Sequence, residues 1–259
     1  MTILPIQPNT PDWHRIRQQF VGASEIAALF DVSPWMTRFE LWHLKKGNIA
    51  ENYQGTVRTR YGQKLEAAIA ECVAEETGWL ITEPLGYYAH DTVKGMGCTP
   101  DRFITLQDEY KYRGQGCLEI KNVDRIIFAK DWSDDEPPLH IILQLQDQLA
   151  CTGCHWGAVA ALVGGNDLKI YTFDRHEKTI NKLESAVTDF WETIEKNIEP
   201  MPFAADDYDT VKRLFSEVRE EEIDLSGDNE LPILCAELKS LGSMRGNTEK
   251  REKELKAKI

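Results

Sequence analysis

The chain has 259 residues, of which 42% are hydrophobic and 28% are charged, and its formal net charge at pH 7 is -13. That length and apolar content are enough for one sizeable hydrophobic core. No apolar run approaches the ~18 residues of a membrane-spanning helix, and the first residues lack the charged and then apolar layout of a secretory signal. We therefore predict a soluble protein of the cytoplasm, with no membrane association.

The six cysteines are scattered, but Cys151, Cys154 and His155 form a C-x-x-C-H pattern. Covalent haem attachment normally follows export, for which the sequence carries no signal, and a structural zinc site needs four ligands, of which this segment supplies only part. The cysteine spacing also fails to suggest a four-thiolate iron–sulfur cluster. We predict reduced cysteines that mostly lie in the core.

The negative net charge argues against broad non-specific binding to nucleic acid, because Lys and Arg supply most of that affinity. The charge is unevenly distributed, however, since acidic residues dominate residues 206–237. Basic residues gather in two early clusters: His14, Arg15 and Arg17, and Arg58, Arg60 and Lys64. Each cluster can be a solvated charged surface, but an acidic exterior with local basic grooves is also compatible with DNA binding.

The apolar spacing predicts alternating helices and strands along residues 1–202, followed by a change in composition. Helices are expected at 24–30, capped by Ser24, at 38–47 and at 61–78, where Leu65, Ile69, Cys72 and Val73 form an apolar stripe. Strands are expected at 86–90, 96–104 and 116–123, and the polar, Gly-containing connection between the last two suits an antiparallel pair. We then expect a helix at 141–153, strands at 155–164 and 168–175, and a helix at 179–200. The fold class is α/β (α+β), with a mixed sheet between helices. Residues 203–259 read as an acidic and then basic, helical segment.

Alternation along strand 116–123 places Glu119 and Lys121 on one face and apolar residues on the other. Alone, this pair would be a surface ion pair of little worth. Glu66, Asp101 and Gln144 lie on neighbouring predicted elements, so three carboxylates could converge beside one lysine. Hard oxygen ligands suit Mg²⁺ or Mn²⁺, and a lysine can orient an attacking water, as phosphodiester hydrolysis requires.

The segments "PDRF" and "LEIK" together resemble the PD-(D/E)xK nuclease motif. The wider pattern is similar to the lambda-exonuclease and YqaJ-like viral recombinase family. "WHRIRQQFVGASEIAALFDVSPW" resembles the opening signature of that family, "YGQKLE" its glutamate-bearing helix, and "LQLQDQLACTG" its closing helix. The resemblance extends over roughly residues 12–200 and implies a restriction-endonuclease-like core; several ordered motifs carry it, which is more specific than a short motif alone.

The resemblance implies a Mg²⁺-dependent exonuclease, with Mn²⁺ able to substitute, that digests one strand of duplex DNA from its 5′ end. The 3′ single strand would pass to a single-strand annealing protein in a bacterium or phage-infected host cell, and a ring of three subunits would surround the DNA. Carried over by position, Glu66, Asp101, Glu119 and the Ile120 carbonyl would hold metal, Lys121 and Gln144 would position water and phosphate, and Arg17 and Ser24 would contact the 5′-phosphate. Ile141 departs from the pattern, because a tyrosine is expected three residues before the glutamine.

Two other functions remain open at this point. A structure-specific or restriction-type endonuclease could use the same core, because the motif sets the chemistry and surrounding elements set the substrate. A non-catalytic module that binds DNA ends or a protein partner is the second alternative. Three of these residues also have a purely structural interpretation: Ser24 as a helix cap, Arg17 as a surface charge, and Gln144 as one of three glutamines in a polar helix.

Overall fold

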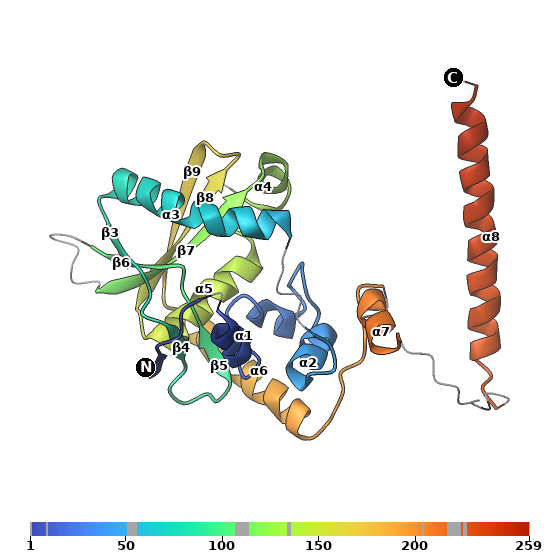
Figure 1. Ribbon diagram of the computed structural model, residues 1–259, viewed down its shortest axis with the longest axis horizontal. Helices are drawn as coiled ribbons and strands as arrows, with labels where there is room; N and C mark the ends of the chain where they lie inside the picture. Colours follow the sequence, from blue (N-terminus) through green and yellow to red (C-terminus); the bar gives the residue numbers. More distant parts are fainter. Residues whose placement is uncertain are drawn as a thin grey trace. The chain divides into compact units, whose positions relative to one another are not determined.

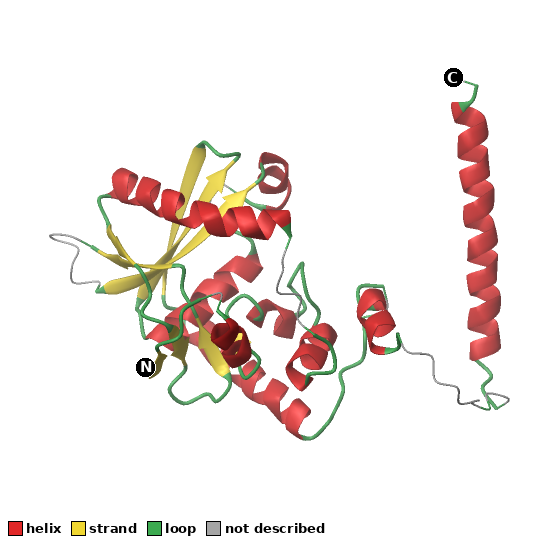
Figure 2. Ribbon diagram, viewed as in Figure 1, coloured by secondary structure: helices red, strands yellow, loops and turns green. Residues whose placement is uncertain are grey.

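The computed structural model describes residues 2–8, 10–50, 56–106, 114–133, 136–203, 205–216, 224 and 227–258. The chain divides into two units, Met1–Phe215 and Ser216–Ile259. The first unit combines two sheets with helices, whereas the described part of the second unit is mainly one helix (Figures 1 and 2). The division falls after α7 (Tyr208–Leu214), so this short helix belongs to the first unit.

The larger sheet has five strands in the order β3-β6-β7-β8-β9. Strands β7 and β8 pair in parallel, and the other neighbours pair antiparallel, including β6 with β7 as the sequence predicts. The mixed sheet expected from the sequence is therefore confirmed. The strands are β3 (Leu80–Thr82), β6 (Arg102–Thr105), β7 (Gln115–Val123), β8 (Trp156–Val163) and β9 (Asp167–Asp174).

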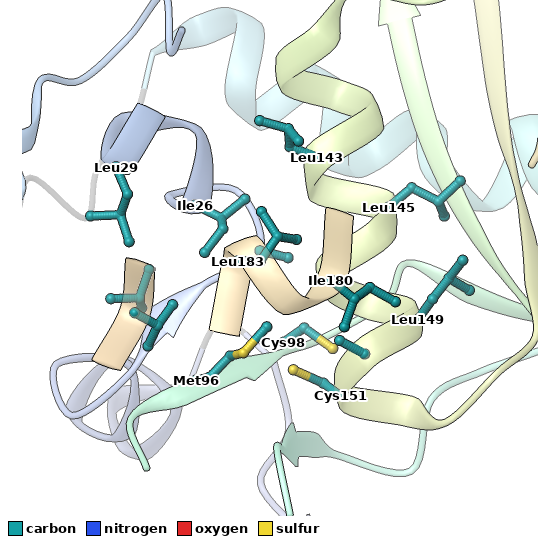
Figure 3. Close-up of a cluster of buried hydrophobic side chains, with 14 of the residues drawn as sticks. Ile26, Leu29, Met96, Cys98, Leu143, Leu145, Leu149, Cys151, Ile180 and Leu183 are labelled. Carbon is teal, nitrogen blue, oxygen red and sulfur yellow. The ribbon is translucent and has the colours of Figure 1, made fainter. Parts of the chain in front are cut away.

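Two helices cover opposite faces of this sheet (Figure 1). Helix α3 (Val57–Thr77) packs Ile69 and Val73 in one core cluster with Leu118 and Ile120 of β7. Helix α5 (Leu139–Thr152) packs Leu145 and Leu149 in the other cluster, with Cys117 of β7. Figure 3 shows part of that second cluster, where α5 meets α6 (Glu177–Glu195). Because strand residues alternate, the face of β7 that carries Glu119 is turned toward α5.

The smaller sheet has four strands in the order β1-β4-β5-β2. The single strand predicted for residues 96–104 is wrong, because β5 (Met96–Cys98) lies in this sheet and β6 in the larger one. Pro100 stands between them, and a proline lacks the N–H that a continuing ladder needs. The remaining elements are β1 (Thr2–Leu4), β2 (Val21–Gly22), β4 (Tyr87–Ala89), α1 (Pro11–Arg17), the 3₁₀ helix η1 (Ile26–Phe30), α2 (Arg38–Lys46) and α4 (Arg125–Asp131).

The predicted cap at Ser24 is wrong. Helix η1 begins at Ile26 with Glu25 in the cap position, and no side chain caps it. Ser24 lies in the turn before it and is exposed, while the Glu25 carboxylate accepts a hydrogen bond from the N–H of Gly22 at 2.8 Å. A buried acid tied to the preceding strand thus organises this turn in place of a serine cap.

The apolar stripe of α3 is also narrower than predicted. Ile69, Ala70 and Val73 are buried, but Leu65 and Cys72 are exposed, because only a narrow arc of the helix faces the sheet. Of the six cysteines, Cys72 and Cys235 are exposed. The other four are free and buried, as expected for most of them: Cys98, Cys117, Cys151 and Cys154.

The second unit contains α8 (Leu231–Lys256), which confirms the helix predicted near the C-terminus. It buries none of its residues, and Leu234, Leu238 and Leu241 are exposed. In the part of the chain that the structure describes, no helix is long and apolar enough to cross a membrane.

Candidate active site

A cavity of about 400 Å³ brings together every residue that the sequence singles out for chemistry. It opens where β6, β7, α3 and α5 meet the turn around Ser24. The predicted residues that line it are Arg17, Ser24, Glu66, Asp101, Glu119, Ile120, Lys121 and Gln144. Trp13 and Tyr87, which sequence reasoning did not select, line it as well.

Glu119 lies at the floor of the cavity and is only 2% exposed. Its Oε1 atom accepts hydrogen bonds from the Lys121 ammonium and from the Gln144 amide, the latter at 2.7 Å. Lys121 also donates to the Gln144 Oε1 atom at 3.3 Å. The strand alternation that the sequence shows therefore places Glu119 and Lys121 against the same helix, α5, and Gln144 joins them.

Sequence reasoning missed Gln148. Its amide nitrogen donates to the Oε2 atom of Glu119 at 2.6 Å, from one helical turn beyond Gln144. The spacing of four residues along a predicted helix could have suggested that Gln144 and Gln148 share a face. Gln146 faces elsewhere: it bonds the main chain of Asp174, the last residue of β9, and of His176, which follows the strand.

Asp101 connects β6 to β7, because its Oδ2 atom accepts a hydrogen bond from the N–H of Ile120 at 2.7 Å. Burial, and then the Glu119 carboxylate, raise the pKa of Asp101 well above its usual range. Burial likewise raises the pKa of Glu66, although the Arg102 guanidinium partly offsets it. Burial lowers the pKa of Lys121, but the Glu119 and Asp101 carboxylates outweigh it and bring the pKa above its usual value.

This electrostatic pattern fits a divalent cation. Carboxylates that are crowded and partly desolvated gain from a nearby positive charge, and their oxygens are the ligands that Mg²⁺ and Mn²⁺ prefer. Ligand atoms that bind one ion directly lie within about 4.8 Å of one another. Among the described residues, the carboxylate oxygens of Glu66, Asp101 and Glu119 do not all meet this distance. Mg²⁺ keeps several water ligands, so a carboxylate can also act on it through a water.

The described residues that do cluster within 4.8 Å are Cys98, Asp147 and Cys151, in the core between α5 and β5. Burial raises the pKa of Asp147 well above its usual range, because it disfavours the charged carboxylate. Its Oδ1 atom has no hydrogen-bond partner among the described residues. Three donors are one fewer than a structural zinc site uses, so we assign this group to the core.

Arg17 also lines the cavity. Its guanidinium lies over the Trp13 ring, 4.6 Å from the centroid, and bonds the Glu25 carboxylate at 3.3 Å. Glu25 also accepts from Lys45 at 2.7 Å. Burial raises the pKa of Glu25, but Lys45 and Arg17 more than reverse the effect and bring the pKa below its usual value. Two cations therefore share one carboxylate, which leaves this buried group positively charged.

Ile141 occupies the position where the resemblance predicted a tyrosine. It is 4% exposed and belongs to the hydrophobic core on the α5 side of the sheet. It is not among the cavity residues, so the side chain at this position supplies packing.

Residues 12–155 match the model of the YqaJ-like viral recombinase domain. The chain belongs to the YqaJ-like viral recombinase family. This YqaJ-like chain is 24% identical over 182 residues to the uncharacterized protein YqaJ of Bacillus subtilis (strain 168), an alignment that covers 70% of this chain and 54% of that protein. The chain thus spans about half the length of this curated relative.

The YqaJ-like chain also resembles solved structures of LHK-Exo, an alkaline exonuclease from Laribacter hongkongensis. The TM-score is 0.56 at 23% identity, over 78% of this chain and 100% of the other. A second structure, of LHK-Exo with dAMP, gives the same TM-score at 22% identity over 78% of this chain and 99% of the other. These likenesses confirm the predicted fold class, a PD-(D/E)xK-type core with a mixed sheet between helices.

Proposed function

We propose that this protein is a metal-dependent exonuclease that digests one strand of duplex DNA from its 5′ end and leaves a 3′ single strand. One observation carries the proposal: a single cavity is lined both by the carboxylates with Lys121 and by Arg17, which belongs to a positively charged group with Glu25 and Lys45. A nuclease that only cuts internally needs the first feature alone. Membership in a viral recombinase family and the fold of an alkaline exonuclease support the proposal.

The carboxylates of Glu66, Asp101 and Glu119 and the carbonyl of Ile120 would hold the cation. When bound, a Mg²⁺ ion would polarise the scissile phosphate and make a water easier to deprotonate. Lys121 would direct its ammonium group to the phosphate or the water, because the raised pKa keeps it protonated at neutral pH. Gln144, which bonds both Glu119 and Lys121, would hold these two side chains in fixed positions relative to each other.

Arg17 would bind the terminal 5′-phosphate. Without Lys45, the Arg17–Glu25 pair would be electrically neutral; Lys45 compensates Glu25 and leaves the guanidinium attractive to an anion. The exposed hydroxyl of Ser24 would add a hydrogen bond. The helix predicted to begin at Ser24 instead begins at Ile26 and is a 3₁₀ helix. The dAMP complex of LHK-Exo supports a deoxynucleotide as the class of ligand.

The test is a time course on linear duplex DNA labelled at one end, with a covalently closed circle of the same sequence as control. We expect Mg²⁺-dependent release of mononucleotides from the 5′ strand and no attack on the circle. Cutting of the circle would favour the endonuclease alternative. Absence of any Mg²⁺- or Mn²⁺-dependent cleavage would favour a binding module.

We further propose a single-strand annealing protein as the partner that receives the 3′ strand, and a ring of three subunits as the active assembly. Both rest on the family resemblance. Light scattering during gel filtration, with and without duplex DNA, measures the assembly; a monomer in both conditions would contradict the ring.

A further inference from the structure

Gln148 makes a side-chain hydrogen bond to Glu119 and lies outside the residues that line the cavity. It is fully buried, with no exposed side-chain surface. Its amide oxygen has no hydrogen-bond partner among the described residues. Resting on the function proposed above, the geometry points to Gln148 as a positioning residue that fixes the Glu119 carboxylate for metal binding.

The two oxygens of Glu119 are held differently. Oε1 faces Lys121 and Gln144, which both line the cavity, whereas Oε2 is held by Gln148 from behind. The terminal torsion of a glutamate is soft, so a carboxylate held at one oxygen can rotate. Donors on both oxygens define the plane of the carboxylate and therefore the direction in which its remaining lone pairs point.

An amide suits this task because it donates without adding charge. A lysine or arginine in place of Gln148 would neutralise Glu119 and oppose a cation in the cavity. The orientation of the amide is also determined: Glu119 Oε2 can only accept, so the Gln148 NH₂ group must face it, and the amide oxygen must point away. The unpaired oxygen lowers stability, and such local costs concentrate at functional sites.

Gln146 provides a matched control on the same helix. It is 3% exposed, and both ends of its amide are satisfied, by the carbonyl of Asp174 at 3.0 Å and the N–H of His176 at 2.9 Å. It is not among the residues that line the cavity. Replacement of either glutamine by methionine removes a buried amide of similar size, but only Gln148→Met removes a donor to Glu119.

The experiment compares Mn²⁺ binding by the wild-type protein, Gln148→Met and Gln146→Met, measured by electron paramagnetic resonance of free Mn²⁺. Loss of a partner that orients a metal ligand typically weakens metal affinity by about 10–100-fold. We expect a weakening of that size in Gln148→Met and unchanged affinity in Gln146→Met. In cleavage assays, Gln148→Met should need a correspondingly higher Mg²⁺ concentration for half-maximal rate and recover most of its rate at saturating metal.

Equal weakening in both variants, or wild-type affinity in Gln148→Met, would overturn the assignment. If Gln148→Met does not fold, Gln148→Asn keeps an amide but withdraws it by one methylene, and the same loss of Mn²⁺ affinity is expected. Failure of the wild-type protein to bind Mn²⁺ or to cleave DNA would instead overturn the proposed function, and the role of Gln148 with it. The two failures are therefore distinguishable.

Discussion

The carboxylate of Asp101 accepts a hydrogen bond from the backbone N–H of Ile120 at 2.7 Å. Ile120 lies between Glu119 and Lys121, so the acid immediately before β6 is tied to the strand segment that carries the other two groups. The bond also leaves one Asp101 oxygen for another partner. The Asp101 side chain thus serves both the geometry of the site and the connection between β6 and β7.

Asp101→Asn should remove cleavage while it preserves the fold, because an asparagine oxygen can still accept from Ile120 but carries no charge. We expect a loss in rate of at least about 100-fold at saturating DNA, measured on end-labelled duplex. Glu119→Gln should lose activity as well. Glu119→Gln should also lower the free energy of unfolding by about 1–3 kcal/mol relative to wild type. Both Glu119 oxygens accept hydrogen bonds, so the NH₂ group of the new amide would face another donor, either Gln148 or the pair Lys121 and Gln144. The control for both variants is Glu192→Gln on the exposed surface of α6. Wild-type rates in Asp101→Asn would remove Asp101 from the site.

Lys121→Ala should lower the rate by about 10²–10⁴-fold, the range for a positioned group in the transition state. Because neighbouring carboxylates raise the pKa of Lys121, the lysine is protonated at neutral pH and acts as a donor. We therefore expect the rate of Lys121→Ala to gain little from a higher pH, measured in cleavage assays between neutral and alkaline buffers. Lys130→Ala, on exposed α4, is the control. Substantial rescue at high pH would show that the lysine instead helps a water lose its proton.

The nature of the ligands predicts which metals support the reaction. Carboxylate and carbonyl oxygens should give activity with Mg²⁺ or Mn²⁺, and loss with Ca²⁺, which is larger and accepts looser geometry. Ca²⁺ should still support DNA binding. Assays with each ion after treatment with a chelator provide the measurement. Cleavage that survives the chelator, or that requires Zn²⁺, contradicts a site built from oxygen ligands.

Arg17 should make the protein sensitive to the chemistry of the 5′ end. A charged contact is worth about 1.5–3 kcal/mol, so 5′-phosphorylated ends should be digested roughly tenfold to a hundredfold faster than 5′-hydroxyl ends. Arg17→Ala should erase most of this difference and leave Mn²⁺ binding intact. Arg15→Ala is the matched control, because Arg15 lies on the same helix, is exposed and pairs with Asp12. Equal rates on both ends in the wild-type protein would show that Arg17 does not read the phosphate.

Asp147 should make the protein less stable as pH rises. Its pKa is raised well above the usual range by burial and, more weakly, by Glu25, while the hydrogen bond from Cys151 lowers it. The native state therefore holds a proton that the unfolded chain releases above about pH 4, and stability falls as pH rises from there toward the native pKa. Asp147→Asn should remove this slope.

We expect Asp147→Asn to be more stable than wild type at about pH 8. It should lose that advantage near pH 4 and below, where the Asp147 carboxyl of the wild-type protein becomes protonated in the unfolded chain as well as in the native state. Urea unfolding at the two pH values measures the difference. Asp189→Asn, at an exposed position of α6, should show no such crossover. A constant difference between Asp147→Asn and wild type at both values would mean that the buried carboxyl does not titrate in this way.

Much of the candidate site could be predicted from local pattern. The two-residue period of a strand is enough to place Glu119 and Lys121 on one face, and helical spacing is enough to align Gln144 with Gln148. Strand β7, helix α5 and the pairing of β6 with β7 also follow from period and turn signals within short windows. These features depend on backbone geometry that neighbouring residues share, so the sequence by itself determines them.

Other features depend on contacts between segments far apart in the chain, and only the tertiary structure decided them. Residues 96–104 separate into two sheets because Met96–Cys98 pairs with β2 and β4, whereas Arg102–Thr105 pairs with β3 and β7. Ser24 does not cap the helix as predicted, since the helix begins at Ile26 after Glu25, a buried carboxylate that pairs with Lys45 of the distant helix α2. Gln148 differs from Gln146 only through what each meets across the core, Glu119 in one case and the end of β9 in the other. A side chain's partner is set by long-range packing, which no local period encodes.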